Sequence, residues 1–177
     1  MSDLVQVSGS NRYDCLTRWL HWIFVVGIIY ASIVGYSLAL IKDRPALHDF
    51  LSHLNASLAT VLIPLFVLRL VWKFMRTNPS PPILGPRQLM MARAVQSLLY
   101  LIIFEVLVSG FLMMPHGYMF FDVIFIPTPF EKGAMTELFA QLHSIGNICL
   151  VVIVVLHVAG VISNNLFKGV DVLRRMW

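Results

Sequence analysis

The sequence predicts an all-α integral membrane protein, a four-helix bundle with both termini in the cytoplasm. Three observations support this prediction: the composition, four long apolar runs and the distribution of basic residues. The chain has 177 residues, of which 58% are hydrophobic and 12% are charged, and its mean hydropathy is +0.79. A soluble domain of this length carries about twice that charged fraction. We therefore expect one transmembrane domain over residues 1–177, without a separate soluble domain.

Each apolar run is long enough to cross a hydrocarbon core of about 30 Å. The first has no charge from Trp19 to Ile41, and the third contains one acidic residue, Glu105, besides Arg93 near its start. Pro64 lies inside the second run and should kink that helix. The connection over residues 116–136 is rich in Phe, Pro and Gly, and its periodicity leaves open whether a short interfacial helix forms there. The expected spans are about residues 17–41, 50–74, 90–114 and 138–167.

Basic residues are distributed unevenly between the two sets of loops, which predicts the orientation of the bundle. Only Lys42, Arg44 and Lys132 lie in the first and third loops. The other ten lie at the N-terminus, in the second loop, at the C-terminus or at the adjoining helix ends. They are Arg12, Arg18, Arg69, Lys73, Arg76, Arg87, Arg93, Lys168, Arg174 and Arg175. Both termini should therefore be cytoplasmic, and the first and third loops should face outward.

Four of the six histidines lie near the ends of the spans and match in depth. His143 and His157 are fourteen residues apart on the fourth run. This spacing puts both imidazoles on nearly the same helix face, about 21 Å apart along the axis. His21 lies near the cytoplasmic start of the first span, and His53 lies near the outer start of the second. Depth therefore pairs His21 with His157 near the cytoplasm and His53 with His143 near the outside.

Such pairs suit haem iron, because neutral imidazole is a strong axial ligand and two imidazoles fill both axial positions. An iron without an open position suits one-electron transfer, and two haems at different depths would carry electrons across the bilayer. The chain lacks a C-x-x-C-H motif, so haem would be bound non-covalently. Small residues three, four or seven positions after the histidines would leave room for it. These are Ala56, Ser57, Thr60, Gly146 and Gly160.

Each histidine taken alone is also compatible with roles that do not involve haem. A histidine inside a membrane often forms a hydrogen bond between helices or lines a proton path. Zinc is a weaker alternative, because neither pair has a nearby Cys or carboxylate to complete a tetrahedral set. Four histidines that match in depth and helix face favour haem over these roles.

Several charged residues have two interpretations. A carboxyl near the middle of a span is costly unless it is protonated or hydrogen-bonded. Glu105 is therefore either a proton relay to a quinone or a buried neutral acid. Arginines at the cytoplasmic boundary either pair with haem propionates or simply set the topology. These are Arg18, Arg69, Arg93 and Arg174. Outer basic residues could steer an anion such as superoxide, although acidic residues accompany them. The basic ones are Lys42, Arg44, His116 and Lys132, and the acidic ones are Asp43, Asp122, Glu131 and Glu137.

Four segments resemble the bacterial cytochrome b561 family of four-helix di-haem membrane cytochromes. They are RWLHW (18–22), SHLNAS (52–57), SLLYLIIF…SGFLMM (97–114) and LHSIGN…LHVAGVISNNLFKGVDVLRRM (142–176). The strongest marks are the H-x13-H spacing in the fourth run and the 32-residue gap from His21 to His53, which favours His53 over His48. The chain departs from the family pattern at Ser57, where a glycine is common, and at residues 164–165, where Asn-Asn replaces a common His-His pair.

The resemblance implies two non-covalent haem b groups, with His21 and His157 as axial ligands of one and His53 and His143 of the other. It implies electron exchange with the quinone pool and, for some relatives, oxidation of superoxide at the outer face with ubiquinone as acceptor. The expected protein is an oxidoreductase of the bacterial inner membrane, whose partners are lipid, quinone and a small-molecule electron donor rather than nucleic acid. Two rival functions stay open: a haem b subunit that anchors a periplasmic dehydrogenase or hydrogenase, and a haem-free transport or scaffold protein.

Overall fold

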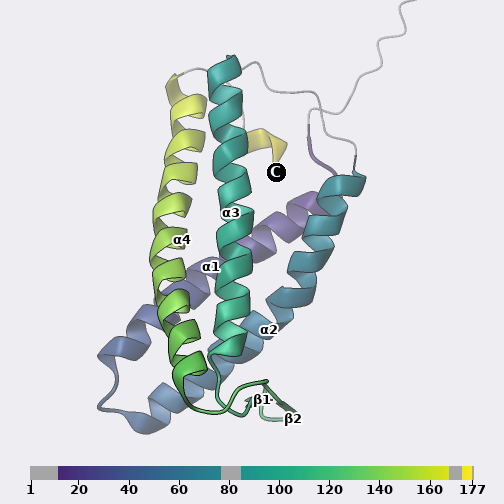
Figure 1. The fold of residues 1–177 in the computed structure, drawn as a ribbon. Helices are drawn as coiled ribbons and strands as arrows, with labels where there is room; N and C mark the ends of the chain where they lie inside the picture. Colours follow the sequence, from purple (N-terminus) through teal and green to yellow (C-terminus); the bar gives the residue numbers. More distant parts are fainter. Residues whose placement is uncertain (1–11, 77–84, 168–172, 177) are drawn as a thin grey trace, which may run out of the picture.

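Four long helices make up most of the computed structural model (Figure 1), which describes residues 12–76, 85–167 and 173–176. All four helices are long and apolar enough to cross a membrane. The fold class predicted from composition and apolar runs, an all-α membrane bundle, is therefore confirmed. Lys168, one of the residues behind the predicted orientation, lies outside the described residues. In chain order the elements are α1 (Cys15–Leu40), α2 (Pro45–Met75), α3 (Pro86–Leu112), β1 (Tyr118–Phe120), β2 (Ile124–Ile126), α4 (Ala134–Phe167) and η1 (Leu173–Arg175), which is a 3₁₀ turn.

The helices associate as two antiparallel pairs. α1 packs along α2, α3 packs along α4, and a smaller contact between α2 and α3 joins the pairs. Figure 1 shows α3 and α4 running side by side, while α1 crosses behind them obliquely. We call the end of the bundle that holds Cys15, Met75 and Phe167 the terminal end, and the end that holds Leu40 and the β1–β2 strands the hairpin end.

α2 begins at Pro45 rather than near residue 50, where its charge-free run starts. Proline suits the first turn of a helix, because the N–H that it lacks would have no helical partner there. The helix then continues through Pro64 to Met75. α2 is therefore longer than its apolar run, and its first turns project toward the hairpin end.

Hydrogen bonds fasten the helices together at the terminal end. Asp14 caps α1 by accepting from the Thr17 backbone N–H at 2.9 Å, and the Trp72 indole N–H donates to the same carboxylate at 2.9 Å. The Trp22 indole N–H donates to the Met176 carbonyl at 3.0 Å, which holds the segment after η1 against α1. The start of α1 is thus attached to the end of α2 and to the last described residues of the chain.

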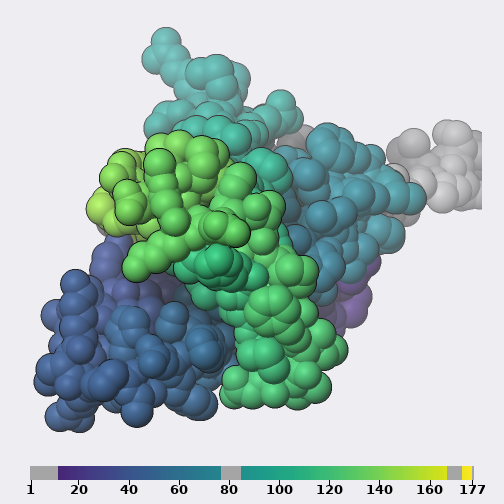
Figure 2. Space-filling view, turned by 60° about the horizontal axis from the view of Figure 1, so that its bottom comes forward, coloured from purple at the N-terminus to yellow at the C-terminus, as the bar shows by residue number. Residues whose placement is uncertain are grey.

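The connection between α3 and α4 contains a β-hairpin. The sequence had left open whether a short interfacial helix forms there. β1 and β2 pair antiparallel, with Tyr118 opposite Ile126 and Phe120 opposite Ile124. Phe121 and Asp122 are the central residues of a turn closed by the Val123 N–H, which donates to the Phe120 carbonyl at 3.0 Å. Their φ values of 46° and 57° lie in the left-handed region. Figure 2, which brings the hairpin end forward, shows the α1–α2 corner, the hairpin segment and the start of α4 gathered on one face.

Candidate functional site

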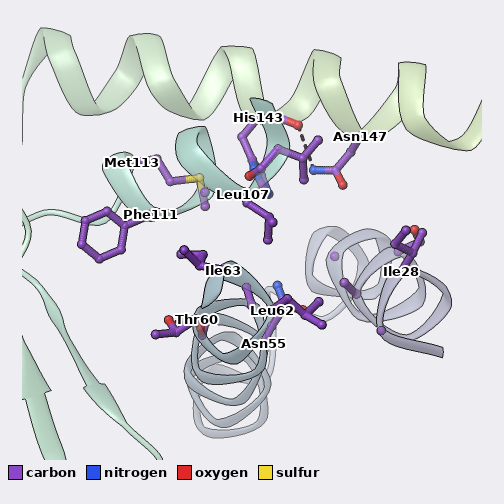
Figure 3. Close-up of a pocket in the computed structure, with 18 of the residues that line it drawn as sticks. Ile28, Asn55, Thr60, Leu62, Ile63, Leu107, Phe111, Met113, His143 and Asn147 are labelled. Carbon is purple, nitrogen blue, oxygen red and sulfur yellow. Dashed lines mark hydrogen bonds between the residues drawn. The ribbon is translucent and has the colours of Figure 1, made fainter. Parts of the chain in front are cut away.

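A cavity lies between the two helix pairs toward the hairpin end (Figure 3), and we call it the hairpin-end cavity. About 1000 Å³ of space lies between its lining residues, its open side included. All four helices and Tyr118 of β1 contribute to its lining, which is mostly apolar. Its polar side chains are few, as in sites that bind a large apolar molecule and orient it by its polar groups. They include Ser32, Ser52, Asn55, Thr60, His143 and Asn147.

His143 projects from α4 into this cavity, with Asn55 and Thr60 of α2 on the facing wall (Figure 3). Its Nδ1 lies 3.0 Å from the Val106 carbonyl oxygen and 3.3 Å from Ser109 Oγ. A carbonyl can only accept, so the Nδ1–H donates to it and the lone pair of Nε2 stays free to bind a metal. Histidine ligands are held in this way in most metal sites.

Gly110 of α3 provides the space for the His143 ring. A Cβ at this position would lie 2.9 Å from His143 Cε1 and 3.1 Å from Nδ1, which is too close for either atom. The imidazole is therefore held between a backbone carbonyl and a glycine of the same helix. This arrangement limits its rotation before any ligand binds.

Gly146 has a different role from the one expected from its spacing. The sequence suggested that it leaves room for haem beside His143, but the Glu105 side chain occupies that space, and a Cβ on Gly146 would collide with Glu105 Oε2. Both carboxyl oxygens of Glu105 are buried and have no hydrogen-bond partner among the described residues. The described residues therefore offer no hydrogen bond that would offset the cost of burying this carboxyl, and the two interpretations of Glu105 stay open.

His53 lies at the margin of the hairpin-end cavity and is not among the residues that line it. Its Nδ1 is 4.0 Å from Asp122 Oδ1, and its side chain is 49% exposed. It shares one face of α2 with Ser57 and Thr60, which we call the His53 stripe. The hairpin packs on this stripe, because Phe121 N–H donates to Ser57 Oγ at 2.9 Å and the Thr60 and Tyr118 hydroxyls are in contact. The structure thus places His143 in the cavity and His53 beside its outer edge, under the hairpin.

The structure brings His21, His157 and Arg69 together at the terminal end. His21 is within electrostatic range of the other two side chains, and Arg69 Nη2 lies 3.5 Å from His21 Nδ1. The guanidinium also donates to the Leu20 carbonyl at 3.2 Å and to the Tyr100 hydroxyl at 3.3 Å. Arg69 therefore places a cation beside His21, and the axial pairing of His21 with His157 stays a prediction.

The sequence did not reveal the partners that hold these histidines. Val106 contributes only its backbone carbonyl, so its side chain gives no signal. Asp122 is one of several acidic residues on the outer side, and the sequence does not distinguish it from the others. Asn55 lies two residues after His53 in an apolar run, and its polarity there was the only available signal. Its Oδ1 is buried without a hydrogen-bond partner among the described residues and lies at the cavity wall. Such an unpartnered acceptor is typical of a site that is completed by a ligand.

Other expected residues lie away from both groups. His48 contacts Asp49 at 3.4 Å near the start of α2, and its side chain is 37% exposed. Arg93 is exposed on α3. Within the described residues, no group of three or more His, Cys, Asp or Glu side chains converges as a bare metal ion would require. Histidines held singly on facing helices suit a flat group whose metal takes one ligand on each side.

Two comparisons with known proteins bear on the family of this chain. A family model described as prokaryotic cytochrome b561 matches residues 12–177, which include all four helices. The chain is also similar to cytochrome b561 homolog 2 of Escherichia coli (strain K12), with 24% identity over 173 residues. That match covers 94% of this chain and 91% of the relative.

Proposed function

Because this chain belongs to the prokaryotic cytochrome b561 family, it is a multi-pass bacterial membrane protein that transfers electrons through haem b, and we propose that it holds two haems and exchanges electrons with the quinone pool. The observation that carries the proposal is the placement of two histidines on α4. His143 and His157 are about 21 Å apart along that helix, and each lies among a different set of partners. One helix can thus supply one axial ligand at each of two depths.

The residues at the hairpin end fit haem. His143 presents an unprotonated Nε2, because its Nδ1–H is bonded to the Val106 carbonyl. Gly110 leaves space for the ring, and Asn55 Oδ1 is an unpartnered acceptor at the wall. When bound, haem b supplies a one-electron carrier whose iron accepts an imidazole on each face. We propose His53 as the second ligand, because it lies on the same face of α2 as Thr60, and Thr60 lines the cavity.

At the terminal end we propose His21 and His157 as the two axial ligands. Ligation through Nε2 requires a proton on Nδ1, and a guanidinium cannot accept that proton. Arg69 must therefore leave His21 Nδ1 when iron binds. A carboxylate is the natural partner for the released guanidinium, so we propose that Arg69 then pairs with a haem propionate.

The orientation proposed from the basic residues puts the hairpin end outside the inner membrane and the terminal end in the cytoplasm. Electrons could then pass between an outer donor and ubiquinone. With superoxide as donor, each molecule gives up one electron and leaves as O₂. Two electrons and two protons from solution convert ubiquinone to ubiquinol, so two superoxides are consumed for each quinone.

Anaerobic reduction of the purified protein tests this function. Ubiquinol, ascorbate and superoxide are added in turn, and the reduced-minus-oxidised haem band is recorded. We expect two haems per chain and reduction by ubiquinol. A protein without a haem band, or one that ubiquinol and superoxide both fail to reduce, would contradict the proposal. A stable periplasmic dehydrogenase or hydrogenase that co-purifies with the chain would favour the rival role as an anchoring haem subunit.

A further inference from the structure

The β1–β2 hairpin presents an acidic side chain to a histidine on another element. Asp122 Oδ1 lies 4.0 Å from His53 Nδ1, within range of an ion pair or of a bridging water. The two residues are far apart in the sequence, and the fold of the hairpin is what brings them together. An exposed loop could make such an approach by chance, so the contacts that hold the hairpin decide whether Asp122 is fixed there.

The turn that carries Asp122 is strained. Phe121 has φ = 46°, and a bulky residue is rarely found in the left-handed region because its Cβ crowds the backbone there. Asp122, with φ = 57°, is one of the few residue types that enter this region more readily. A turn with Phe at its first central position persists only if contacts elsewhere hold it.

Those contacts converge on the His53 stripe. The Phe121 N–H donates to Ser57 Oγ at 2.9 Å, and Ser57 is the most deeply buried polar side chain in the described residues, at 1% exposure. One helical turn further, the Thr60 hydroxyl meets the Tyr118 hydroxyl of β1. Tyr118 is itself buried and packs edge-on against Phe111 of α3. The hairpin is thus attached to the residues that follow His53 by one and by two helical turns.

These contacts fix the position of the turn relative to His53. The bonds to Ser57 and Thr60 set the position of the turn along α2. The left-handed conformation of Phe121 and Asp122 then directs the Asp122 side chain toward the His53 imidazole. Ser57, where a glycine is common in the family, takes part in this arrangement. A glycine has no side-chain oxygen that could accept the Phe121 N–H.

We propose that Asp122 is a positioning residue for His53 as an axial ligand of the hairpin-end haem, an inference that rests on the proposed function. A carboxylate at Nδ1 holds the proton on that nitrogen and leaves Nε2 free for iron. It also makes the imidazole a stronger electron donor, which stabilises the oxidised iron and lowers the midpoint potential. At the corresponding position, His143 Nδ1 has the neutral Val106 carbonyl and the Ser109 hydroxyl, so a carboxylate at Nδ1 is specific to the His53 side of the site.

Spectroelectrochemical titration of the haem-loaded protein tests this inference. Asp122→Asn keeps the size of the side chain and removes its charge. We expect it to retain both haems and to shift one midpoint potential in the positive direction, with the other unchanged. Asp122→Glu should restore the wild-type value. Glu131→Gln is the matched control, because it removes one negative charge from an exposed residue in the loop between β2 and α4. We expect that variant to leave both potentials in place.

His53→Ala identifies which potential belongs to this site, because it should remove the same haem whose potential Asp122→Asn shifts. Unchanged potentials in Asp122→Asn, or equal shifts of both, would overturn the role of Asp122. If the Asp122→Asn variant lacks one haem, an Asp122→Glu variant that keeps both haems supports the inference. An Asp122→Glu variant that also lacks that haem overturns it. If His53→Ala keeps two haems, the ligand assignment itself is wrong, and that result is distinct from a failure of Asp122.

Discussion

The hairpin end and the terminal end hold their histidines in opposite ways. At the hairpin end, His143 donates its Nδ1–H to a backbone carbonyl, which leaves Nε2 ready to bind a metal. At the terminal end, Arg69 Nη2 approaches His21 Nδ1 as a donor at 3.5 Å. If His21 is an axial ligand through Nε2, as we propose, Arg69 would have to turn away from Nδ1, whereas His143 would need no such change. A backbone carbonyl is held in place by its helix, but an arginine side chain can move to a new partner.

Removing one ligand at each end tests this comparison with the largest expected effect. His143→Ala should lose the hairpin-end haem and keep the other, and His157→Ala should do the reverse. In each case one axial bond to iron is lost, and no neighbouring His remains to replace it at that depth. The haem-to-protein ratio of the purified variants would fall from two to one.

Spectra of the two variants should differ, because each retains a different haem. If either variant keeps both haems, or if either loses both, the ends are not independent sites. His116→Ala is a suitable control, because this residue lies between α3 and β1 and has no proposed ligand role. That variant should keep both haems.

A glycine-to-alanine pair tests how closely α3 and α4 pack. Gly146→Ala brings a Cβ into collision with the Glu105 carboxyl, and overpacking of this kind costs about 1–3 kcal/mol. Gly133→Ala is the control directly before the same helix, because a Cβ there meets nothing within 4 Å. Thermal unfolding in detergent should show a lower midpoint for the first variant only. Adding Glu105→Ala to Gly146→Ala should recover part of the loss, and a purely additive double variant would show that the two residues do not interact.

The smallest expected effect concerns the capping group at the terminal end. Asp14→Ala should lower the free energy of unfolding by about 1 kcal/mol, since the cap of α1 and the bond from Trp72 are both lost. Burial alone would raise the pKa of Asp14, but hydrogen bonds from Thr17 and Trp72 and the charge of Arg76 outweigh it, so its pKa is lowered from the ordinary value of 3.8. Because the folded-state pKa of Asp14 is lowered, the stabilisation by its ionised carboxylate is present above pH 3.8. That stabilisation is lost as the pH falls through the folded-state pKa.

Unfolding curves for the wild type and Asp14→Asn between about pH 2 and pH 5 would measure this effect. Asparagine also caps helices but does not titrate in this range. The stability difference between the two proteins should therefore narrow as the pH falls. A difference that stays constant with pH would mean that the carboxylate charge contributes nothing at the terminal end.

The comparison of the two ends also shows where reasoning from sequence succeeded. Composition and apolar runs were sufficient for the four helices, because hydrophobicity and span length are local properties. The pairing of His21 with His157 follows from helix pitch and depth and stays a prediction, whereas the contact of Arg69 with His21 was not predicted. The hairpin was not predicted, because its strands are only three residues long and its turn lacks the usual Asn or Gly. The filling of the space at Gly146 by Glu105 was also missed, since it depends on how α3 and α4 rotate against each other.

By itself, the sequence determined a membrane bundle of four helices and two histidines on one face of its last helix. These properties follow from the period of the α-helix and from the thickness of the bilayer. Only the tertiary structure decided which atoms lie against the candidate ligand histidines. These are the Val106 carbonyl at His143, Arg69 at His21, and Asp122 beside His53. These contacts join residues on different helices or loops, so they depend on the rotation of each helix about its axis and on the path of the hairpin.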